Sequence, residues 1–152
     1  MRIVETKEEL VRACRAAARP LGLVPTMGAL HDGHLTLVRQ AREENQTLAV
    51  TIFVNPTQFS PQEDLAQYPR DLDRDLGLLR GESVDLVFVP PAEEIYPPGF
   101  DTWVQAGALA ERLEGAHRPG HFRGVTTVLT KLFNLIGPDR AYFGQKDGQQ
   151  TV

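Results

Sequence analysis

The chain has 152 residues, of which 41% are hydrophobic and 24% are charged, and its formal net charge is −4. This length and composition predict one soluble domain with a core of its own. The 16 basic residues are scattered, which argues against a nucleic-acid partner. No apolar run reaches the ~18 residues of a membrane span, and the single cysteine, Cys14, excludes an internal disulfide. A cytoplasmic protein without a membrane partner is the default expectation.

The first third of the chain predicts one β-α-β unit. Residues 6–9 (TKEE) have the spacing of a capping box, so Thr6 is expected to open a helix that stops before Pro20. The apolar run 21–24 predicts a strand, and helical spacing returns from residue 33 to residue 41. Residues 48–54 (LAVTIFV) are apolar enough for a strand buried on both faces.

The alternation continues to the end of the chain. Leucines at 72, 76 and 79 predict a third helix, residues 84–89 a third core strand, and residues 102–105 a short edge strand. Apolar residues from Val125 to Ile136 follow the helical template throughout, and a Gly-Pro pair ends that helix before a fourth core strand at 141–143. Short connections between alternating strands and helices predict an α/β fold, a Rossmann-like parallel sheet with helices on both faces.

In such a sheet, ligands bind beyond the carboxyl ends of the strands. Three candidate clusters follow predicted strands: PTMGALHDGH at 25–34, FVNPTQF at 53–59 and YFGQKD at 142–147. We expect these clusters to meet at one edge of the sheet.

The first cluster has the composition of a phosphate site. Gly28 lets the backbone approach a ligand, and the N-terminus of the next helix offers free N–H groups and a partial positive charge. His31 and His34 would add hydrogen bonds without a permanent charge. The alternative is that Asp32 caps the helix and His34 is a half-buried packing residue. A metal site is disfavoured because HExxH and cysteine ligands are lacking.

The other clusters offer amides and a cation. Gln58 can donate to a carboxylate without neutralising it, so the carboxylate stays nucleophilic; an Asx-type turn at Asn55 is the alternative. Lys146 suits a phosphate as a point charge, with a solvated surface lysine as the alternative. Residues 117–123 (HRPGHFR) bring several cationic side chains together, which indicates a loop that faces an anion. The alternative is a loop that only caps the following helix.

A family resemblance follows from these motifs. HDGH resembles the HxGH signature of the nucleotidyltransferase superfamily, the HIGH-type domain. PTMGALHDGH, FVNPTQF, YPRDLDRDL, LEGAHRPGHFRGV and FGQKD, in this order, resemble the pantothenate synthetase family over essentially the whole chain. The resemblance implies a cytoplasmic, homodimeric ligase that joins pantoate to β-alanine with ATP and Mg²⁺. It releases AMP and pyrophosphate through a pantoyl-adenylate intermediate.

The resemblance also implies site residues. His34, His31 and Lys146 would be catalytic. Gln58 and Gln150 would bind pantoate, and Gln58 would also lie near β-alanine. No residue is assigned as a metal ligand, and Asp73 and Asp75 are candidates only for outer contacts. The ATP-binding positions would be Met27, Gly28, Ala29, Leu30, His31, Asp32, Gly33, His34, Gly144, Gln145, Lys146 and Asp147.

Two features depart from the family pattern. Family members continue into a second domain that closes over the nucleotide, and no part of this chain matches it; Gly148 stands where the family usually has tyrosine. We therefore expect residues 1–152 to form the nucleotide- and pantoate-binding domain and to be catalytically weak or silent alone. The alternatives are another HxGH nucleotidyltransferase and a catalytically silent nucleotide-binding fragment.

Overall fold

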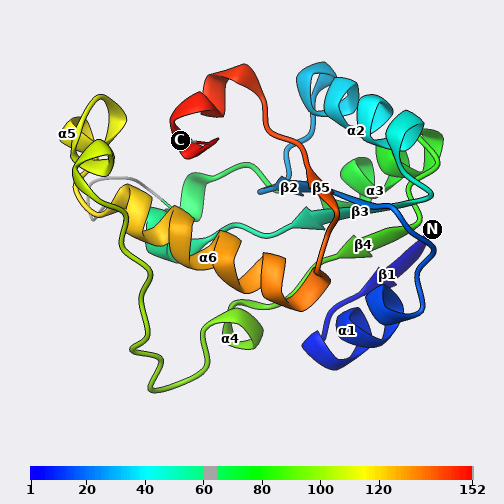
Figure 1. Cartoon of the computed structure of the whole chain (residues 1–152), viewed down its shortest axis with the longest axis horizontal. Coiled ribbons are helices and arrows are strands. Elements are labelled where there is room, and N and C mark those ends of the chain that lie inside the picture. Colours follow the sequence, from blue (N-terminus) through cyan, green and yellow to red (C-terminus); the bar gives the residue numbers. More distant parts are fainter. Residues whose placement is uncertain (60–64, 152) are drawn as a thin grey trace.

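The computed structural model describes residues 1–59 and 65–151. A five-stranded sheet forms its centre, with every neighbouring pair parallel (Figure 1). In spatial order the strands are β1 (Arg2–Val4), β4 (Leu86–Phe88), β3 (Thr47–Ile52), β2 (Leu21–Thr26) and β5 (Arg140–Ala141). The predicted parallel α/β architecture is confirmed.

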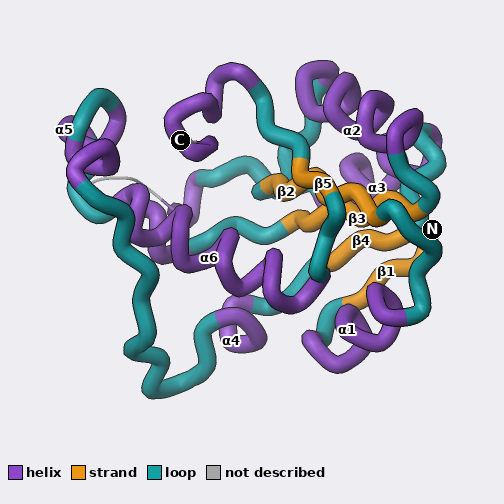
Figure 2. Tube along the Cα trace, in the orientation of Figure 1, coloured by secondary structure: helices purple, strands orange, loops and turns teal. Residues whose placement is uncertain are grey.

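The helices connect and cover these strands (Figure 2). The α-helices are α1 (Lys7–Arg15), α2 (Asp32–Glu44), α3 (Leu72–Gly81), α4 (Ala92–Ile95), α5 (Glu114–His117) and α6 (His121–Ile136). The 3₁₀ segments are η1 (Pro56–Gln58), η2 (Leu65–Gln67), η3 (Ala108–Glu111) and η4 (Gln145–Thr151). Within residues 1–59 and 65–151, no helix is long and apolar enough to cross a membrane.

Two apolar clusters hold the layers together. Figure 1 shows α2 and α3 over one face of the sheet and α1 and α6 over the other. Leu21 and Leu23 of β2 face α1 and α6, whereas Val24 faces α2 and α3. This alternation along one strand means that both faces of the sheet are buried, as the apolar runs predict.

The ends of two helices follow from local chemistry. The Thr6 hydroxyl accepts a hydrogen bond from the Glu9 N–H at 3.3 Å, which confirms Thr6 as the N-cap of α1. Gly137 has a φ of 58° and donates its N–H to the Phe133 carbonyl at 2.8 Å. This left-handed cap ends α6 where the Gly-Pro pair predicts.

The prediction of an edge strand at 102–105 is wrong. The Val104 N–H donates to the Thr127 hydroxyl at 3.0 Å, and the Val104 carbonyl accepts from the Thr126 hydroxyl at 2.6 Å. Helix α6 supplies the hydrogen-bond partners of both the N–H and the carbonyl of Val104. These backbone groups are therefore satisfied without a neighbouring strand, and the segment is a loop.

Other strand predictions need smaller corrections. The strand predicted at 48–54 is β3, which ends at Ile52. The strand predicted at 84–89 is β4, which spans only Leu86–Phe88. The strand predicted at 141–143 is β5, an exposed two-residue edge strand and no core strand. The first strand, β1, was not predicted because two of its three residues are exposed and it has no apolar run.

The order of the strands creates a crevice between β2 and β5. From β2 the chain moves through β3 to β4, and then returns through α6 to the other side of β2. In β2, the residues that pair with β5 are Gly22 and Leu23. Pro25 lies beyond this pairing, so its missing N–H costs no hydrogen bond to β5 and β2 can continue through it. This reversal is the topological switch point at which α/β sheets bind ligands.

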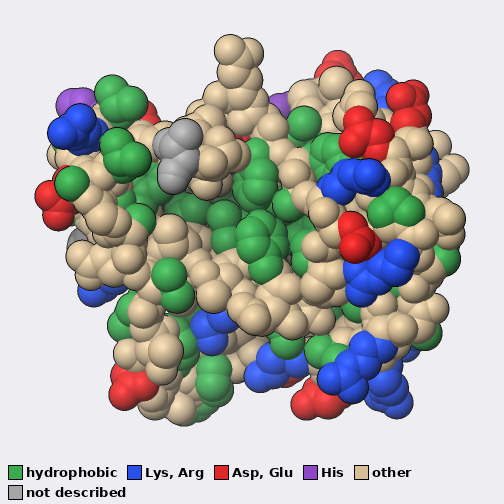
Figure 3. Space-filling model, in the orientation of Figure 1, with side chains coloured by type: hydrophobic (Ala, Val, Ile, Leu, Met, Phe, Trp, Pro, Cys, Tyr) green, Lys and Arg blue, Asp and Glu red, His purple; other side chains and the backbone are tan. Residues whose placement is uncertain are grey.

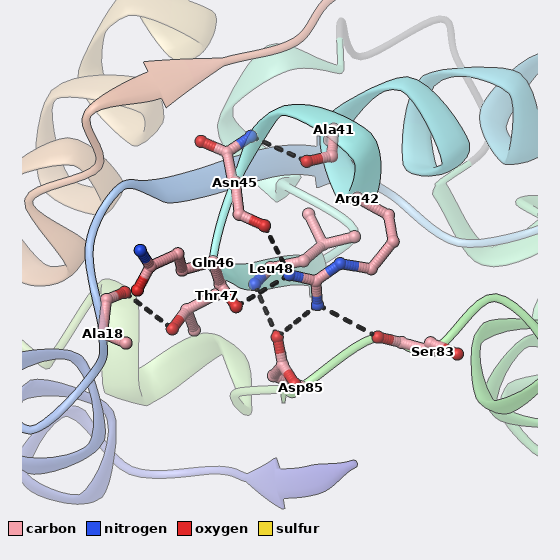
Figure 4. A network of polar contacts seen from close by, with 9 residues as sticks. All are labelled: Ala18, Ala41, Arg42, Asn45, Gln46, Thr47, Leu48, Ser83 and Asp85. Atoms are coloured by element: carbon pink, nitrogen blue, oxygen red, sulfur yellow. Dashed lines mark hydrogen bonds and ion pairs between the residues drawn. The ribbon is translucent and has the colours of Figure 1, made fainter.

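A polar network holds the amino ends of β3 and β4, at the end of the sheet opposite the crevice (Figure 4). Arg42, near the end of α2, donates to the carbonyl of Gln46 at 2.7 Å and to the carboxylate of Asp85 at 2.6 Å. Asp85 also accepts from the Leu48 N–H at 2.8 Å. The amino ends of β3 and β4 are thereby tied to α2, and the carboxyl ends are left for a ligand.

Candidate functional site

A cavity of about 350 Å³ opens at the switch point. Figure 3 shows a hollow near the centre of the face, floored by hydrophobic side chains between α6 and the C-terminal segment. The lining comes from the segments that follow β2, β3 and β5 and from one side of α6. The lining residues are Pro25, Thr26, Met27, Gly28, Ala29, His31, His34, Leu37, Thr51, Phe53, Asn55, Gln58, Tyr68, Val125, Val128, Leu129, Leu132, Tyr142, Phe143, Gly144, Lys146, Asp147 and Gln150.

The loop after β2 has an unusual backbone. Gly28 has a φ of 84° and Ala29 a φ of 52°, so two consecutive residues lie in the left-handed region. Alanine has no intrinsic preference for this region and adopts it at a cost of about 1 kcal/mol. Backbone strain of this kind persists only where the surrounding structure holds it.

Asp75 of α3 holds this loop. Its two carboxylate oxygens accept from the N–H groups of Ala29 and Leu30, each at 2.8 Å. Arg74 donates to the Leu30 carbonyl at 2.8 Å, so consecutive residues of α3 bind both polar groups of one loop residue. The loop that faces the cavity therefore takes its shape from a helix 45 residues further along the chain.

This role of Asp75 was not predicted. The leucines at 72, 76 and 79 indicate the buried stripe of α3, but Leu72 is 41% exposed and Asp75 is 1% exposed. Asp75 lies three residues after Leu72 and one before Leu76, on the face that turns inward. An aspartate on a buried helical stripe was the available signal, because such a residue needs hydrogen-bond partners.

The two histidines form the start of α2. His31 is the N-cap and its Nδ1 accepts from the Gly33 N–H at 3.1 Å; the alternative cap, Asp32, is wrong, since it is the first helical residue. The Nδ1 of His34 accepts from the His31 N–H at 3.4 Å, and the ring centroids lie 4.1 Å apart. With Nδ1 accepting in both rings, each neutral imidazole carries its proton on Nε2. Each ring therefore has one N–H to offer a ligand.

The environment of His34 keeps its ring neutral. Burial lowers the pKa of His34 below its ordinary value, and the neighbouring His31 and Lys146 lower this pKa further. A neutral imidazole beside a helix N-terminus donates a hydrogen bond to a phosphoryl oxygen without a permanent charge.

Asn55 orients the amide of Gln58. The Asn55 side chain is 1% exposed and its Nδ2 donates to the Gln58 Oε1 at 3.0 Å. Its Oδ1 accepts from the Thr57 hydroxyl at 2.9 Å and from the Tyr96 hydroxyl at 2.8 Å. Since the Gln58 oxygen faces Asn55, its NH₂ group is the end available to a ligand. The local Asx-type turn exists, and it serves to aim Gln58.

The segment after β5 brings a cation and a carboxylate to the cavity. The Nζ of Lys146 lies 2.8 Å from the Asp147 carboxylate, and the Lys146 side chain is 65% exposed. The Nε2 of Gln150 lies 3.5 Å from the same carboxylate. Lys146 is therefore held by an ion pair with its own neighbour in the sequence.

The structure brings most of the predicted ATP and pantoate positions into one cavity, including His31, His34, Gln58, Lys146 and Gln150. Four predicted positions do not line it. Leu30 is buried in the core, and Asp32, Gly33 and Gln145 are exposed outside the cavity.

The cationic segment 117–123 does not line the cavity either. His117 is exposed, and the Arg123 guanidinium stacks 4.6 Å from the centre of the Trp103 ring. Of its residues, His121 contacts the site, and it does so through the backbone of Gln58. In the described part of the chain, no group of three or more His, Cys, Asp or Glu residues is arranged to hold a metal ion.

Comparisons with known proteins agree with this arrangement. The family model for Pantoate-beta-alanine ligase matches residues 2–152. The chain is 63% identical to the pantothenate synthetase of Roseiflexus castenholzii and 57% identical to that of Thermotoga petrophila. It covers 55% of each of these relatives, while 100% and 99% of the chain is aligned. The chain therefore spans about half the length of the curated relatives it matches.

Solved structures give the same match. The pantothenate synthetase of Thermus thermophilus superimposes with a TM-score of 0.93 at 55% identity, over 99% of this chain and 54% of that chain. The pantoate-beta-alanine ligase of Francisella tularensis, complexed with Beta-gamma ATP and Beta-alanine, superimposes with a TM-score of 0.95 at 40% identity. That match covers 99% of this chain and 59% of the other.

Proposed function

The chain belongs to the pantoate–β-alanine ligase family, and on that premise we propose that residues 1–152 form the nucleotide- and pantoate-binding domain of an ATP-dependent ligase. The reaction condenses pantoate with β-alanine and yields pantothenate, AMP and pyrophosphate through pantoyl adenylate. A cytoplasmic location and a homodimer are part of this proposal and rest on the family resemblance.

One observation carries the proposal. The cavity at the switch point collects a neutral imidazole, an amide donor and a cation on a flexible side chain from three different strand ends, namely His34, Gln58 and Lys146. These are the groups that adenylation of a carboxylate needs: donors for phosphate oxygens and a neutral donor for the attacking carboxylate.

ATP fits the side of the cavity formed by the loop after β2 and the start of α2. The positive end of the α2 helix dipole favours phosphate there, and His31 and His34 add two Nε2–H donors, since the Nδ1 atom of each ring already accepts from a backbone N–H. Lys146 would exchange its Asp147 partner for a phosphate oxygen.

The donor set also fits Mg²⁺ held mainly by ATP. Among the described residues, Asp147 is the carboxylate that lines the cavity, and Mg²⁺ commonly binds through substrate phosphates with one or two protein carboxylates. When bound, the ion neutralises charge on the phosphate oxygens.

Pantoate fits the opposite side. Its carbon chain carries two methyl groups, and Val125, Val128, Leu129 and Leu132 give α6 an apolar wall. Gln58 offers its NH₂ group to the carboxylate without removing the negative charge, and Gln150 also lines the cavity.

In the first half-reaction, the pantoate carboxylate oxygen attacks the α-phosphorus and the bond to pyrophosphate breaks. Negative charge grows on the α-phosphate and on the leaving group; His34 is placed in advance to stabilise it, and Lys146 contributes once it has exchanged Asp147 for a phosphate oxygen. A preorganised donor of this kind typically contributes ~10²-fold to ~10³-fold in rate.

In the second half-reaction, the β-alanine amine attacks the activated carbonyl carbon and the bond to AMP breaks. The neutral amine loses one proton to the solvent as the new C–N bond forms. The chain contributes mainly position here, with Gln58 holding the acyl group beside the nucleophile.

Calorimetry and isotope exchange test the proposal. We expect the 152-residue chain to bind ATP and pantoate, and Gln58→Ala to weaken pantoate binding about tenfold with ATP binding unchanged. Gln40→Ala, at an exposed position of α2, is the matched control. A wild-type chain that binds ATP but no pantoate would overturn the proposal in favour of another HxGH nucleotidyltransferase.

Exchange of labelled pyrophosphate into ATP then assigns the chemistry. Exchange that depends on pantoate would place adenylation on these residues. Binding of both ligands without exchange would favour a nucleotide-binding module. The Lys146 side chain is 65% exposed, so in that case its contact with phosphate would have to be shielded from solvent before the reaction could proceed.

A further inference from the structure

The buried histidine at the start of α6 contacts Gln58 from behind the cavity. His121 is 6% exposed, and its Nδ1 lies 3.0 Å from the Gln58 carbonyl oxygen. A carbonyl oxygen only accepts, so Nδ1 carries the proton and donates. Arg118 lies on the other side of the ring, with its Nη1 3.3 Å from the His121 Nε2. An arginine only donates, so both contacts fix the same neutral tautomer.

The first turn of α6 packs tightly against the turn that carries Gln58. A Cβ atom added at Gly124 would lie 2.5 Å from the Thr57 carbonyl oxygen and 2.7 Å from the Gln58 Cα. The Gly124 carbonyl also accepts from the Asn55 Nδ2 at 3.2 Å. Helix α6 therefore contacts η1 at close range along one turn.

Gln58 is thus held at both ends. Asn55 binds its side-chain oxygen, and His121 binds its backbone oxygen. Fixing the peptide group of Gln58 fixes the direction of its Cα–Cβ bond, and the Asn55 contact then decides which end of the amide faces the cavity. A donor displaced by about 1 Å loses much of its value.

We infer that His121 is a positioning residue for pantoate, which acts by holding the backbone of Gln58 through its Nδ1–H donor. The inference rests on the proposed function of Gln58. It predicts an effect on pantoate binding that does not extend to ATP, because the ATP side of the cavity is built from the loop after β2, the start of α2 and Lys146, and His121 contacts none of these in the described hydrogen bonds.

Four variants test this inference. H121F keeps an aromatic ring and removes the donor, H121N places an amide donor near the Nδ1 position, and H121Q places it near the Nε2 position. H117F, at the exposed histidine of the same segment, is the control. Calorimetry gives the Kd of pantoate and of ATP for each chain, and thermal unfolding monitors the fold.

We expect H121F and H121Q to weaken pantoate binding about tenfold, the size expected from one lost hydrogen bond. H121N should stay within about threefold of the wild type, and H117F should equal it. ATP affinity should be unchanged in all four chains. If H121F fails to fold, the contrast between H121N and H121Q carries the test.

Three results would overturn the inference. In the first, H121F binds pantoate as the wild type does while Gln58→Ala does not, which leaves the proposed function intact. In the second, pantoate and ATP affinity fall together with the melting temperature, which is the result of a purely structural role. In the third, the wild type binds no pantoate, and the proposed function fails with the inference.

Discussion

Asp75→Asn tests whether one buried side chain shapes the nucleotide side of the cavity. In the wild type, each carboxylate oxygen accepts from one backbone N–H, at Ala29 and at Leu30. Asparagine keeps one oxygen and puts an NH₂ group where the second stood, so one N–H group faces a donor and is left unpaired.

The size of the effect follows from these contacts. A hydrogen bond to a charged group is worth about 1.5–3 kcal/mol, and an unsatisfied buried donor costs about 1–3 kcal/mol. We expect the free energy of unfolding to fall by about 2–3 kcal/mol. For a domain of this length, the melting temperature should fall by about 5–10 °C. The released strain at Ala29 should let the loop leave the left-handed region.

Urea denaturation and ATP calorimetry measure the two consequences. We expect ATP binding to weaken about tenfold, because the loop that lines the nucleotide side of the cavity no longer keeps its shape. Asp73→Asn, at an exposed position of the same helix, is the control and should change neither quantity. A stability loss with unchanged ATP affinity would refute the link between loop geometry and nucleotide binding. Unchanged stability would refute the assigned hydrogen bonds.

Three further predictions concern other parts of the site. Burial lowers the pKa of His34, so as pH falls below about 6.5 the unfolded chain binds a proton more readily than the folded chain does. The free energy of unfolding of the wild type should therefore fall between about pH 7.5 and about pH 5, and that of His34→Gln should fall less. Urea denaturation at each pH measures this difference. Gly124→Ala should cost about 1–3 kcal/mol of stability through its clash with η1, whereas Gly77→Ala, with open space around it, should stabilise α3 by about 0.5–1 kcal/mol; equal effects would show that the close contact is absent. Lys146→Met should weaken ATP binding about tenfold in low salt and reduce its salt dependence, by calorimetry at two ionic strengths; an unchanged salt dependence would argue against a phosphate contact.

The sequence predicts the elements that carry a full local signal. Helix α6 has an unbroken apolar period and a left-handed glycine at its end, and α1 has its capping threonine, so both are predicted correctly. The strands of the β-α-β unit are long and apolar, and their parallel pairing follows from the helix between them.

Features set by distant partners could not be predicted in this way. The segment 102–105 has the composition of a strand, but the hydroxyls of Thr126 and Thr127 already bind its backbone. Strand β1 exists because β4 offers it an open edge, which no local pattern records. His31 caps α2 although histidine is not a preferred capping residue, because its Nδ1 reaches the Gly33 N–H.

The same division applies to the site. Histidines, glutamine and lysine at strand ends are visible in the sequence, since the carboxyl ends of parallel strands meet. The residues that hold them come from helices that the chain reaches much later: Asp75 for the loop after β2, and His121 for Gln58. A sequence motif therefore predicts which groups meet a ligand, whereas the geometry of these groups depends on contacts across the fold.

The three strand ends differ in how firmly they are held, and this difference indicates an order of events. The loop after β2 and the turn after β3 are bound by the buried side chains of Asp75, Asn55 and His121. Lys146, after β5, is 65% exposed and paired with its own neighbour. Because an exposed ion pair is worth little in water, Lys146 can change partner at low cost. The preformed sides of the cavity should therefore select the ligand, and the Lys146 segment should adjust once phosphate has arrived.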